Sequence, residues 1–329
     1  MRRAVANAAE ARVVAPPNPW VGSVVVGVDG DVYDGATEEP GGRHAERVAL
    51  DAARANAAGA TVYATLEPCS HEGRTGPCAQ ALIDAGVARV VIGVEDPDPQ
   101  VAGSGIMALQ AAGIDVEVGI EAERVARQLA PYLHHRRTGR PLVVLKLAAT
   151  LDGRLAAPDG TSSWITGPEA RADVHRLRAE SDAIIVGAGT VRADDPELTV
   201  RDYRPPVAVG DRSLDPERIV LGAAADDARV QPADNHDGDV SDLIDRLGAD
   251  GALQVMVEGG AGVAGAMYRA GLVDRFVVYL APAVMGGDDG VPMLRGPGAV
   301  TMADVSRGRF VDVTRLGDDV RLTYEPIRP

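Results

Sequence analysis

The sequence predicts an α/β protein of two domains, residues 1–139 and 140–329, each built from alternating strands and helices. Apolar segments of strand length alternate with helical segments twice along the chain. A basic segment that ends in proline separates the two alternating regions near residues 138–141. The 329 residues, 46% of them hydrophobic, suffice for two domains with their own cores.

The first domain is expected to be an α/β layered unit with four strands. These strands are short apolar runs near residues 22–28, 61–66, 88–93 and 114–118. Between them, residues 44–57 have the spacing of an amphipathic helix rich in alanine, and a further helix begins at Pro77-Cys78, because proline suits a first turn. The last helix starts near residue 121 and leads into the basic linker.

The second domain repeats the alternation. Its strands are expected near residues 142–149, 182–187, 206–210, 253–258, 275–281 and 319–325. Residues 222–241 are predicted to form an acidic loop of low order. Thr166 and Glu169, with a proline between them, have the spacing of a capping box, so we expect a helix to begin at Thr166.

A metal site is the strongest functional prediction. His44, Cys69 and Cys78 offer the three protein ligands that a catalytic zinc ion takes, which leaves its fourth position for water. His-x-Glu followed by Pro-Cys and a second cysteine is the signature of zinc deaminases, in which the glutamate, here Glu46, transfers protons. The alternative is a structural zinc, for which His71 is the only nearby fourth ligand, or two inert cysteines.

Composition narrows the class of substrate. A net charge of −15 argues against a broad nucleic-acid interface, so a small-molecule substrate is favoured. No signal peptide or apolar run of membrane-spanning length is present, and two cysteines claimed by a metal fit a reducing compartment. We therefore expect a cytoplasmic enzyme that acts on neither nucleic acids nor membranes.

Lysine usage singles out one residue of the second domain. Lys146 is the only lysine among 33 basic residues, and it lies in the apolar run 142–149. A compact ammonium group in a buried strand can do what a planar guanidinium cannot, so Lys146 is a candidate catalytic group. The alternative is that Lys146 has no catalytic role and occurs at the edge of a strand by chance.

A glycine-rich turn follows the strand expected at residues 253–258. Gly260, Gly262 and Gly265 satisfy G-x-G-x-x-G between a strand and a helix, which lets backbone N–H groups approach a pyrophosphate. The next strand ends without the acidic residue that would hold a ribose 2′-hydroxyl. The absence of this acidic residue favours NADPH over NADH as the cofactor, or a fold other than the Rossmann fold. The alternative is a glycine-rich turn that binds no ligand.

The loop between the two cysteines resembles that of one family. Glu67 to His71, Gly73 to Thr75 and Pro77-Cys78, with Asn18-Pro19 and Val21-Gly22 upstream, are similar to the deaminase half of the bifunctional riboflavin-biosynthesis deaminase/reductases, the RibD family. The resemblance implies a cytidine-deaminase-like α/β/α domain and substrate contacts by Asn18, His71 and Arg74. Thr37 stands where many members carry a histidine, which puts one substrate contact in doubt.

The second domain resembles the reductase half of the same family, through residues 146–156, 162–167, 175–179 and 187–201. This resemblance implies a dihydrofolate-reductase-like α/β fold. It assigns to NADPH Ala148, Trp164, Thr190, Asp194, Gly260, Ala261, Gly262, Val263, Ala264, Gly265 and Ala266. It assigns to the substrate Ser162, Arg178, Leu198, Arg201 and Glu258. Independently of the family, Arg178 and Arg201 suit a phosphate ester, because arginine pairs bidentately with phosphate.

Together the resemblances imply a two-step enzyme. Zinc-dependent deamination of 2,5-diamino-6-ribosylamino-4(3H)-pyrimidinone 5′-phosphate would precede reduction of the ribosyl group to a ribityl chain by NADPH. The family also implies a homo-oligomer, a dimer through the reductase domain. The alternative is an active deaminase with a degenerate or regulatory nucleotide-binding domain. No residue is assigned to the cofactor's 2′-phosphate.

Overall fold

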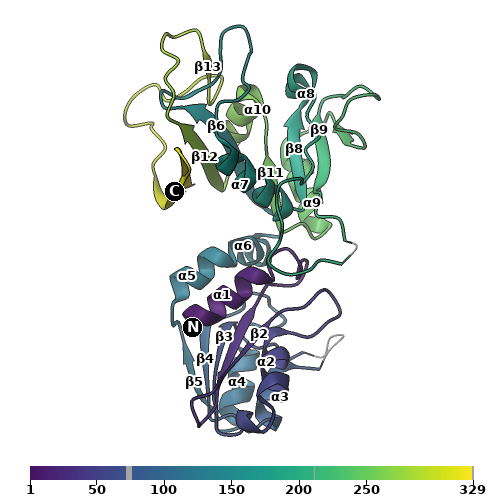
Figure 1. The fold of residues 1–329 in the computed structure, drawn as a ribbon, viewed down its shortest axis with the longest axis vertical. Helices are drawn as coiled ribbons and strands as arrows, with labels where there is room; N and C mark the ends of the chain where they lie inside the picture. The colour runs from purple at the N-terminus through teal and green to yellow at the C-terminus, as the bar shows by residue number, and fades with distance from the viewer. Residues whose placement is uncertain (72–75, 211, 328–329) are drawn as a thin grey trace. The chain divides into compact units, whose positions relative to one another are not determined.

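The computed structural model describes residues 1–71, 76–210 and 212–327, which fall into two compact units (Figure 1). The first unit comprises Met1–Gly139 together with Pro205–Arg212, and the second comprises Arg140–Arg204 and Ser213–Pro329. The short segment Pro205–Arg212 was expected in the second domain, yet it lies with the first unit. There Arg212 donates hydrogen bonds to the carbonyl oxygens of Val14 and Pro16.

The first unit is a five-stranded sheet in the order β2-β1-β3-β4-β5 with helices on both faces. The strands β3, β4 and β5 are parallel, and β1 is antiparallel to both of its neighbours. The strands are β1 Gly22–Val26, β2 Val32–Ala36, β3 Thr61–Leu66, β4 Arg89–Val94 and β5 Asp115–Val118. The helices are α1 Arg2–Glu10, α2 Ala45–Ala53, η1 Arg54–Ala57, α3 Cys78–Asp84, α4 Ser104–Ala111, α5 Ala122–Gln128 and α6 Ala130–Thr138.

Alternation along the strands gives this sheet two apolar faces. Val62 of β3 and Ile92 of β4 pack on one face with Leu82 of α3 and with α2 and α4. On the other face α1 comes so close to β1 that a Cβ added to Gly22 would lie 1.9 Å from the carbonyl oxygen of Ala4. The sheet is therefore the middle layer of three, as the sequence predicted.

The second unit is built on an eight-stranded sheet in the order β10-β9-β8-β11-β6-β12-β15-β14. Its strands from β10 to β12 run parallel, and β15 and β14 are antiparallel additions. Its strands are β6 Leu142–Thr150, β8 Ala183–Gly187, β9 Glu217–Leu221, β10 Asp234–His236, β11 Gln254–Val257, β12 Arg275–Ala281, β14 Gly308–Leu316 and β15 Asp319–Pro326; β7 Arg154–Ala156 pairs with β13 Val291–Pro292. Its helices are α7 Pro168–Ala179, α8 Ala188–Asp194, α9 Val240–Ala249 and α10 Ala261–Arg269.

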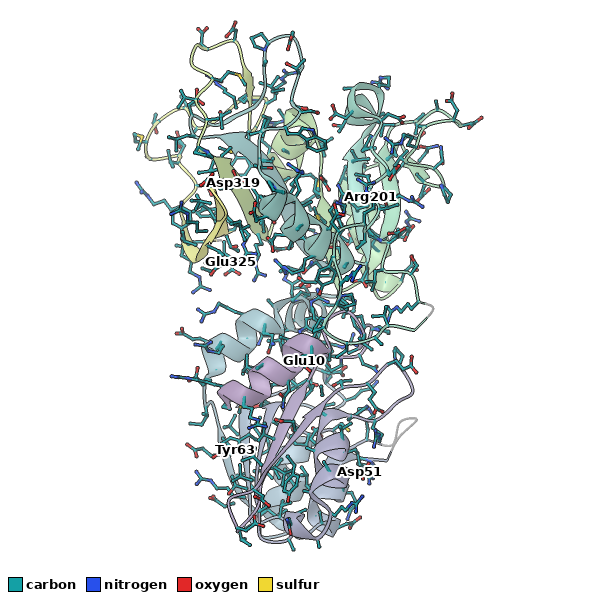
Figure 2. The ribbon with its side chains drawn as sticks, in the orientation of Figure 1. Glu10, Asp51, Tyr63, Arg201, Asp319 and Glu325 are labelled. Atoms are coloured by element: carbon teal, nitrogen blue, oxygen red, sulfur yellow. The ribbon has the colours of Figure 1, made fainter. Side chains whose placement is uncertain are left out.

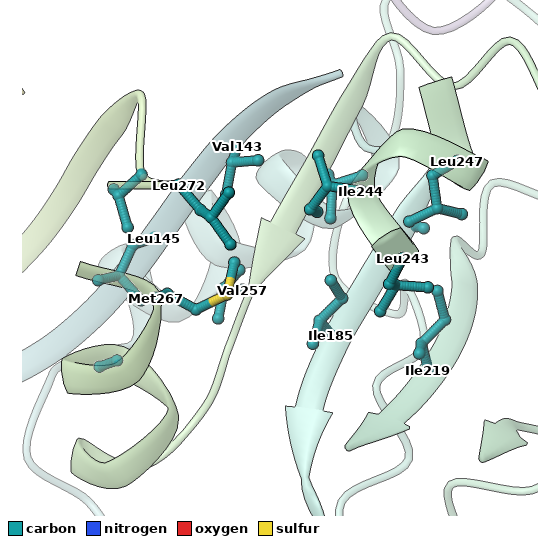
Figure 3. Close-up of a cluster of buried hydrophobic side chains, with 14 of the residues drawn as sticks. Val143, Leu145, Ile185, Ile219, Leu243, Ile244, Leu247, Val257, Met267 and Leu272 are labelled. Carbon is teal, nitrogen blue, oxygen red and sulfur yellow. The ribbon is translucent and has the colours of Figure 1, made fainter. Parts of the chain in front are cut away.

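Helices cover both faces of this sheet as well. Val143 and Leu145 of β6 and Val257 of β11 point into a core that α9 and α10 close with Leu243, Leu247 and Met267 (Figure 3). On the opposite face, α7 is tied to the sheet by Asp173, whose carboxylate accepts hydrogen bonds from Tyr279 and Arg321. Lys146 and Ala148 alternate with the core residues of β6 and so lie on the face that α7 covers.

Several elements differ from the prediction. Strands β2 and β14 were not predicted, because their alternating polar residues are typical of exposed edge strands. The strand expected at residues 206–210 is a loop, and β10 lies within the region predicted as low-order loop. The helix expected from residue 121 is broken at Leu129 into α5 and α6.

The predicted capping box is wrong. Pro168 is the first residue of α7, so Gly167 and not Thr166 is the N-cap. The N–H of Gly167 is bound instead by the buried carboxylate of Asp319, 2.7 Å away at the start of β15 (labelled in Figure 2). A residue distant in sequence therefore supplies the cap. Among the described residues, no helix has both the length and the apolar character of a membrane span.

Candidate functional site

The three predicted metal ligands converge in the first unit. The Nδ1 atom of His44 lies 3.5 Å from the sulfur of Cys69 and 3.3 Å from that of Cys78. One ligand atom from each of the three residues lies within 4.8 Å of the others. One imidazole nitrogen and two sulfurs at this separation form a donor set that suits zinc.

Local structure explains why these residues meet. His44 is the N-cap of α2, and a Cβ on Gly35 of β2 would lie 2.1 Å from the carbonyl oxygen of Ala45, so strand and helix start are in close contact. Cys78 is the first residue of α3, and its N–H donates to the sulfur of Cys69 at 3.4 Å. The N-terminus of a helix stabilises a thiolate. Hydrogen bonds donated to the sulfur of Cys69 by Cys78 and by His44 lower the pKa of Cys69, against the effect of its burial.

Glu46 lies in the first turn of α2 with its side chain buried beside the metal-ligand cluster. Burial, and secondarily the negative charge of Cys69, raises the pKa of Glu46 to about 7. A carboxyl group with a pKa near neutrality can both accept and donate a proton.

Near the metal-ligand cluster lies a second buried carboxylate, that of Glu67, the first residue of the motif Glu67 to His71. The sequence did not predict a role for it. It is buried at the end of β3, two residues before Cys69, and it accepts four main-chain N–H hydrogen bonds. The donors are Asp96 at 3.2 Å, Gly103 at 3.0 Å, Gly105 at 2.9 Å and Ile106 at 3.2 Å. Glu67 therefore connects the N-terminus of α4 to the end of β3, the strand that leads to Cys69. A glutamate two residues before a metal-ligating cysteine does not by itself predict these hydrogen bonds, because their donors are distant in sequence.

Of the three substrate contacts expected in the first unit, the structure describes two, Asn18 and His71. Asn18 is half-buried in the turn before β1, and β1 is antiparallel to β3, so Asn18 and the segment after Leu66 lie at the same edge of the sheet. His71 is exposed and is not part of the metal-ligand cluster. Arg74 lies outside the described residues. The side chain of Thr37 is buried. Its hydroxyl group accepts a hydrogen bond from the N–H of Val21 at 3.0 Å and donates one to the carbonyl oxygen of Val21 at 3.3 Å.

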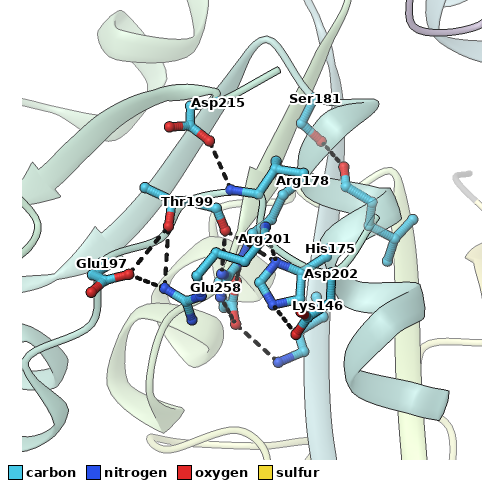
Figure 4. A network of polar contacts seen from close by, with 12 residues as sticks. Lys146, His175, Arg178, Ser181, Glu197, Thr199, Arg201, Asp202, Asp215 and Glu258 are labelled. Carbon is cyan, nitrogen blue, oxygen red and sulfur yellow. Dashed lines mark hydrogen bonds and ion pairs between the residues drawn. The ribbon is translucent and has the colours of Figure 1, made fainter. Parts of the chain in front are cut away.

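In the second unit, Lys146, Arg178 and Glu258 form one ion cluster (Figure 4). Leu145 of β6 is paired with Val257 of β11, so the next residues along these parallel strands, Lys146 and Glu258, lie side by side. The Nζ atom of Lys146 is 3.1 Å from Oε1 of Glu258. Arg178 donates from Nε to Oε2 and from Nη2 to Oε1 of the same carboxylate, both at 3.0 Å.

This ion cluster is largely removed from solvent. The side chains of Lys146, Arg178 and Glu258 are 13%, 10% and 17% exposed. Burial raises the pKa of Glu258, but the charges of Lys146 and Arg178 outweigh it and hold the pKa at about 2. Glu258 is therefore ionised, and the cluster has one more positive than negative charge.

The predicted substrate residues after α8 lie near this cluster. Arg201 is half-exposed, and its guanidinium binds Glu197 and, at 3.2 Å, the hydroxyl of Thr199 (Figure 4). Leu198 has a φ of 55°, in the left-handed region, and its side chain is buried. The carbonyl oxygen of Thr199 accepts a hydrogen bond from Nη1 of Arg178 at 3.0 Å, which links this segment to the ion cluster.

The glycine-rich turn forms the start of α10 at the carboxyl end of β11. Gly260 is the N-cap, and its N–H donates to the hydroxyl of Thr190 in the first turn of α8, at 3.1 Å. The starts of both helices thus meet at one edge of the sheet, where orphan N–H groups can bind an anion. Gly265 has another function, because an added Cβ would lie 2.0 Å from the carbonyl oxygen of Arg295.

The remaining predicted cofactor residues differ in exposure. Ala148 is half-buried on the α7 face of β6, two residues after Lys146. Trp164 is 78% exposed, and the guanidinium of Arg171 lies 4.7 Å from the centre of its ring. Ser162 is half-buried in the same loop, and Asp194 is exposed at the last residue of α8. Ala264 is fully buried in the core.

Two family models match the sequence. The model described as RibD C-terminal domain matches residues 141–322. The model described as cytidine and deoxycytidylate deaminase zinc-binding region matches residues 1–94, which include all three residues of the metal-ligand cluster.

Whole proteins with both parts are also similar to this chain. It is 41% identical to the riboflavin biosynthesis protein RibD of Escherichia coli, over 98% of this chain and 97% of that protein, and 42% identical to that of Mycobacterium tuberculosis, over 98% and 95%. Among solved structures, RibD of Acinetobacter baumannii superposes with a TM-score of 0.90 at 36% identity, covering 100% of this chain and 98% of that one. A Thermotoga maritima diaminohydroxyphosphoribosylaminopyrimidine deaminase/5-amino-6-(5-phosphoribosylamino)uracil reductase superposes with a TM-score of 0.85 at 29% identity, covering 99% and 97%.

Proposed function

The chain belongs to the RibD family of bifunctional deaminase/reductases, and from that premise we propose which of its residues perform each reaction. It is an enzyme of riboflavin biosynthesis with a zinc-binding deaminase domain and a reductase domain. The observation that carries the proposal is the convergence of one histidine and two cysteines beside a buried glutamate, in the same chain as a buried Lys-Glu-Arg cluster.

The first reaction replaces the 2-amino group of 2,5-diamino-6-ribosylamino-4(3H)-pyrimidinone 5′-phosphate with oxygen. His44, Cys69 and Cys78 would hold the zinc ion, which would lower the pKa of a water molecule and so supply the nucleophile. Glu46 takes a proton from that water and delivers one to the departing amine, which leaves as ammonia. Its pKa of about 7 supports both transfers.

A structural zinc site is the less favoured alternative. A structural site takes a fourth protein ligand, but His71, the candidate considered from the sequence, is exposed and outside the cluster. A buried carboxyl group next to the ligands costs stability, and such a group is typical of a catalytic site. We therefore assign Glu46 to catalysis, with Asn18, His71 and Arg74 as substrate contacts.

The second reaction reduces the ribosyl group to a ribityl chain. NADPH would supply the hydride to C1 of the ribosyl group, and Lys146 would polarise or protonate the ring oxygen, which becomes a hydroxyl group when the C1–O bond breaks. Glu258 holds the ammonium group of Lys146 in place, at 3.1 Å. Each nitrogen of Arg178 already makes a hydrogen bond, to Glu258 or Thr199, so Arg201 is the better candidate for the substrate phosphate and Arg178 fixes Glu258.

The pyrophosphate of NADPH would lie at the start of α10. Its first turn offers the N–H groups of Ala261, Gly262 and Val263, and a Cβ on Gly262 would have no atom within 4 Å. Thr190 fixes the position of Gly260. Ala148, Trp164 and Asp194 complete the family's set of cofactor contacts, and Ser162 and Leu198 belong to its set of substrate contacts. The 2′-phosphate of NADPH has no assigned partner.

We also propose that the enzyme is a cytoplasmic homo-oligomer, a dimer through the reductase domain. Strand β14 is the edge of the eight-stranded sheet, and its Phe310 and Val313 are 64% and 61% exposed, which suits burial against a second copy. Light scattering of the purified protein tests this: a monomer mass at all concentrations contradicts it.

Zinc content and the two activities, measured separately, test the proposed function. We expect one zinc ion per chain and, in Cys69→Ser, loss of zinc and of ammonia release. NADPH oxidation with the deaminated intermediate as substrate should be unchanged in that variant. If wild-type protein releases ammonia but never oxidises NADPH, the second domain is a regulatory nucleotide-binding module, and the reductase half of the proposal is wrong.

A further inference from the structure

The segment Leu198–Arg201, which the proposed function places against the substrate, belongs to no strand or helix. Its main-chain polar groups therefore have no partners in a sheet or helix, and three of them are bound by side chains instead. The pairs are Thr199 O with Arg178 Nη1 at 3.0 Å, Val200 N with Asp215 Oδ1 at 2.7 Å and Arg201 N with His175 Nδ1 at 3.2 Å (Figure 4).

The protonation of His175 follows from this arrangement. Its Nδ1 atom lies between the N–H of Arg201, at 3.2 Å, and the carbonyl oxygen of Thr199, at 3.1 Å, and can satisfy only one of them. The carbonyl oxygen already accepts from Arg178, whereas the N–H of Arg201 needs an acceptor. Burial, and then the positive charges of Arg178 and Arg201, lowers the pKa of His175, which favours a neutral ring with Nδ1 as acceptor.

The position of His175 in α7 adds a second link. His175 and Arg178 are three residues apart, so they lie on one face of the helix. Arg178 holds Glu258 and Thr199 together, and His175 holds Arg201 one step further along the segment. The left-handed conformation of Leu198 is strained for a residue with a side chain and persists only where neighbouring contacts hold it.

We propose that His175 is a positioning residue of the reductase reaction: its Nδ1 atom accepts the N–H of Arg201 and holds the segment 198–201 in the conformation that binds the substrate phosphate. The proposal rests on the proposed substrate contact of Arg201. His175 itself touches neither substrate nor cofactor, so its removal should weaken substrate binding far more than it slows hydride transfer.

Three variants separate the acceptor from the volume of the ring. In His175→Asn, Oδ1 stands two bonds from Cβ, as Nδ1 does, and can accept the same N–H. His175→Gln places its oxygen one bond further, where Nε2 stands, and His175→Leu has no acceptor. With the deaminated intermediate as substrate, we expect His175→Leu and His175→Gln to raise KM about tenfold and change kcat by less than about threefold. His175→Asn should stay within about threefold of wild type in KM.

Control measurements distinguish a failure of this inference from misfolding and from a failure of the proposed function. Zinc-dependent ammonia release and NADPH affinity should be unchanged in all three variants, and each variant should unfold well above the assay temperature. If Arg201→Ala raises KM but His175→Leu and His175→Gln do not, the positioning role is wrong and the phosphate contact stands. If His175→Asn is as impaired as His175→Leu, the acceptor role is wrong. If Arg201→Ala leaves KM unchanged, the proposed phosphate contact fails, and this inference fails with it.

Discussion

The carboxyl group of Glu46 lies buried beside two sulfur atoms, and this environment decides how the residue acts. Desolvation disfavours its ionised form, so its pKa rises to about 7, whereas an exposed glutamate would be fully ionised at neutral pH. The same burial would be a defect in a purely structural site. The chemistry of the first unit therefore depends on one proton that Glu46 can hold or release.

We predict that Glu46→Gln abolishes deamination and spares reduction. Glutamine fills the same volume but cannot take up a proton from water, so ammonia release should fall by a factor of about 10² to 10⁴. Zinc content should stay at one per chain, because Glu46 is not among the three candidate ligands. NADPH oxidation with the deaminated intermediate is the internal control; loss of both activities would contradict independent sites.

Lys146 is tested by two substitutions. Lys146→Met leaves Glu258 paired with Arg178 alone, so we expect loss of NADPH oxidation by a factor of about 10² or more and lower stability of the second unit. Lys146→Arg keeps the charge but not the compact ammonium group, and should restore stability more than activity. Equal activity in both variants and the wild type would show that Lys146 is only structural.

The stability effect of Lys146→Met should depend on pH. The folded pKa of Glu258, about 2, lies below its ordinary value of 4.5, so the ionised pair stabilises the fold above about pH 4.5 and this contribution is lost as the pH falls towards 2. Removing Lys146 raises the folded pKa. Urea unfolding should therefore show a larger difference between wild type and Lys146→Met at pH 7 than at pH 3; a constant difference would contradict this.

At the scale of the element, the start of α10 shows that glycines in one motif serve different ends. An added Cβ at Gly262 meets no atom within 4 Å, whereas at Gly265 it would lie 2.0 Å from the carbonyl oxygen of Arg295. Gly262 is thus free to face a ligand, and Gly265 allows close packing of the helix against a loop.

These two glycines form a matched pair of variants. Gly262→Ala should leave the free energy of unfolding unchanged or raise it by up to about 1 kcal/mol, because alanine favours the helix, and should weaken NADPH binding about tenfold. Gly265→Ala should lower the free energy of unfolding by about 1–3 kcal/mol. Urea unfolding and fluorescence titration with NADPH measure both effects. Unaltered NADPH affinity in Gly262→Ala would place the pyrophosphate elsewhere.

Element prediction succeeded where apolar periodicity was strong, and it failed at exposed edges and at β9, an interior strand that was not predicted. Buried strands such as β3 and β6 were predicted within two residues of their bounds. Strands β2 and β14 carry polar residues on an exposed face, which hides them from a search for apolar runs. Residues 206–210 have the apolar composition of a strand, yet form a loop that belongs to the first unit.

At the scale of the whole molecule, the chain is two compact units, each with its own sheet, core and site. The spacing of His44, Cys69 and Cys78 predicted which residues meet, because helix starts and strand ends bring short motifs together. The bonds of Glu67 to α4 and of His175 to Arg201 could not be predicted, because their partners are distant in sequence or are main-chain groups.

Removal of zinc should therefore affect one unit only. A chelator should lower the unfolding temperature of the first unit, since a ligand at a thousand times its Kd stabilises the folded state by about 4 kcal/mol. NADPH oxidation with the deaminated intermediate should continue at the wild-type rate, and added zinc should restore ammonia release. Loss of NADPH oxidation on chelation would show that the two units do not work independently.

Mass spectrometry of the products tests the central claim, that one chain carries both reactions, most directly. Zinc-loaded protein is incubated with the diaminopyrimidine ribosyl phosphate, with and without NADPH. We predict that the deaminated uracil forms without NADPH and the ribityl product only with it. Deamination with no ribityl product and no consumption of NADPH would contradict the account, because the second site would then be without catalytic activity.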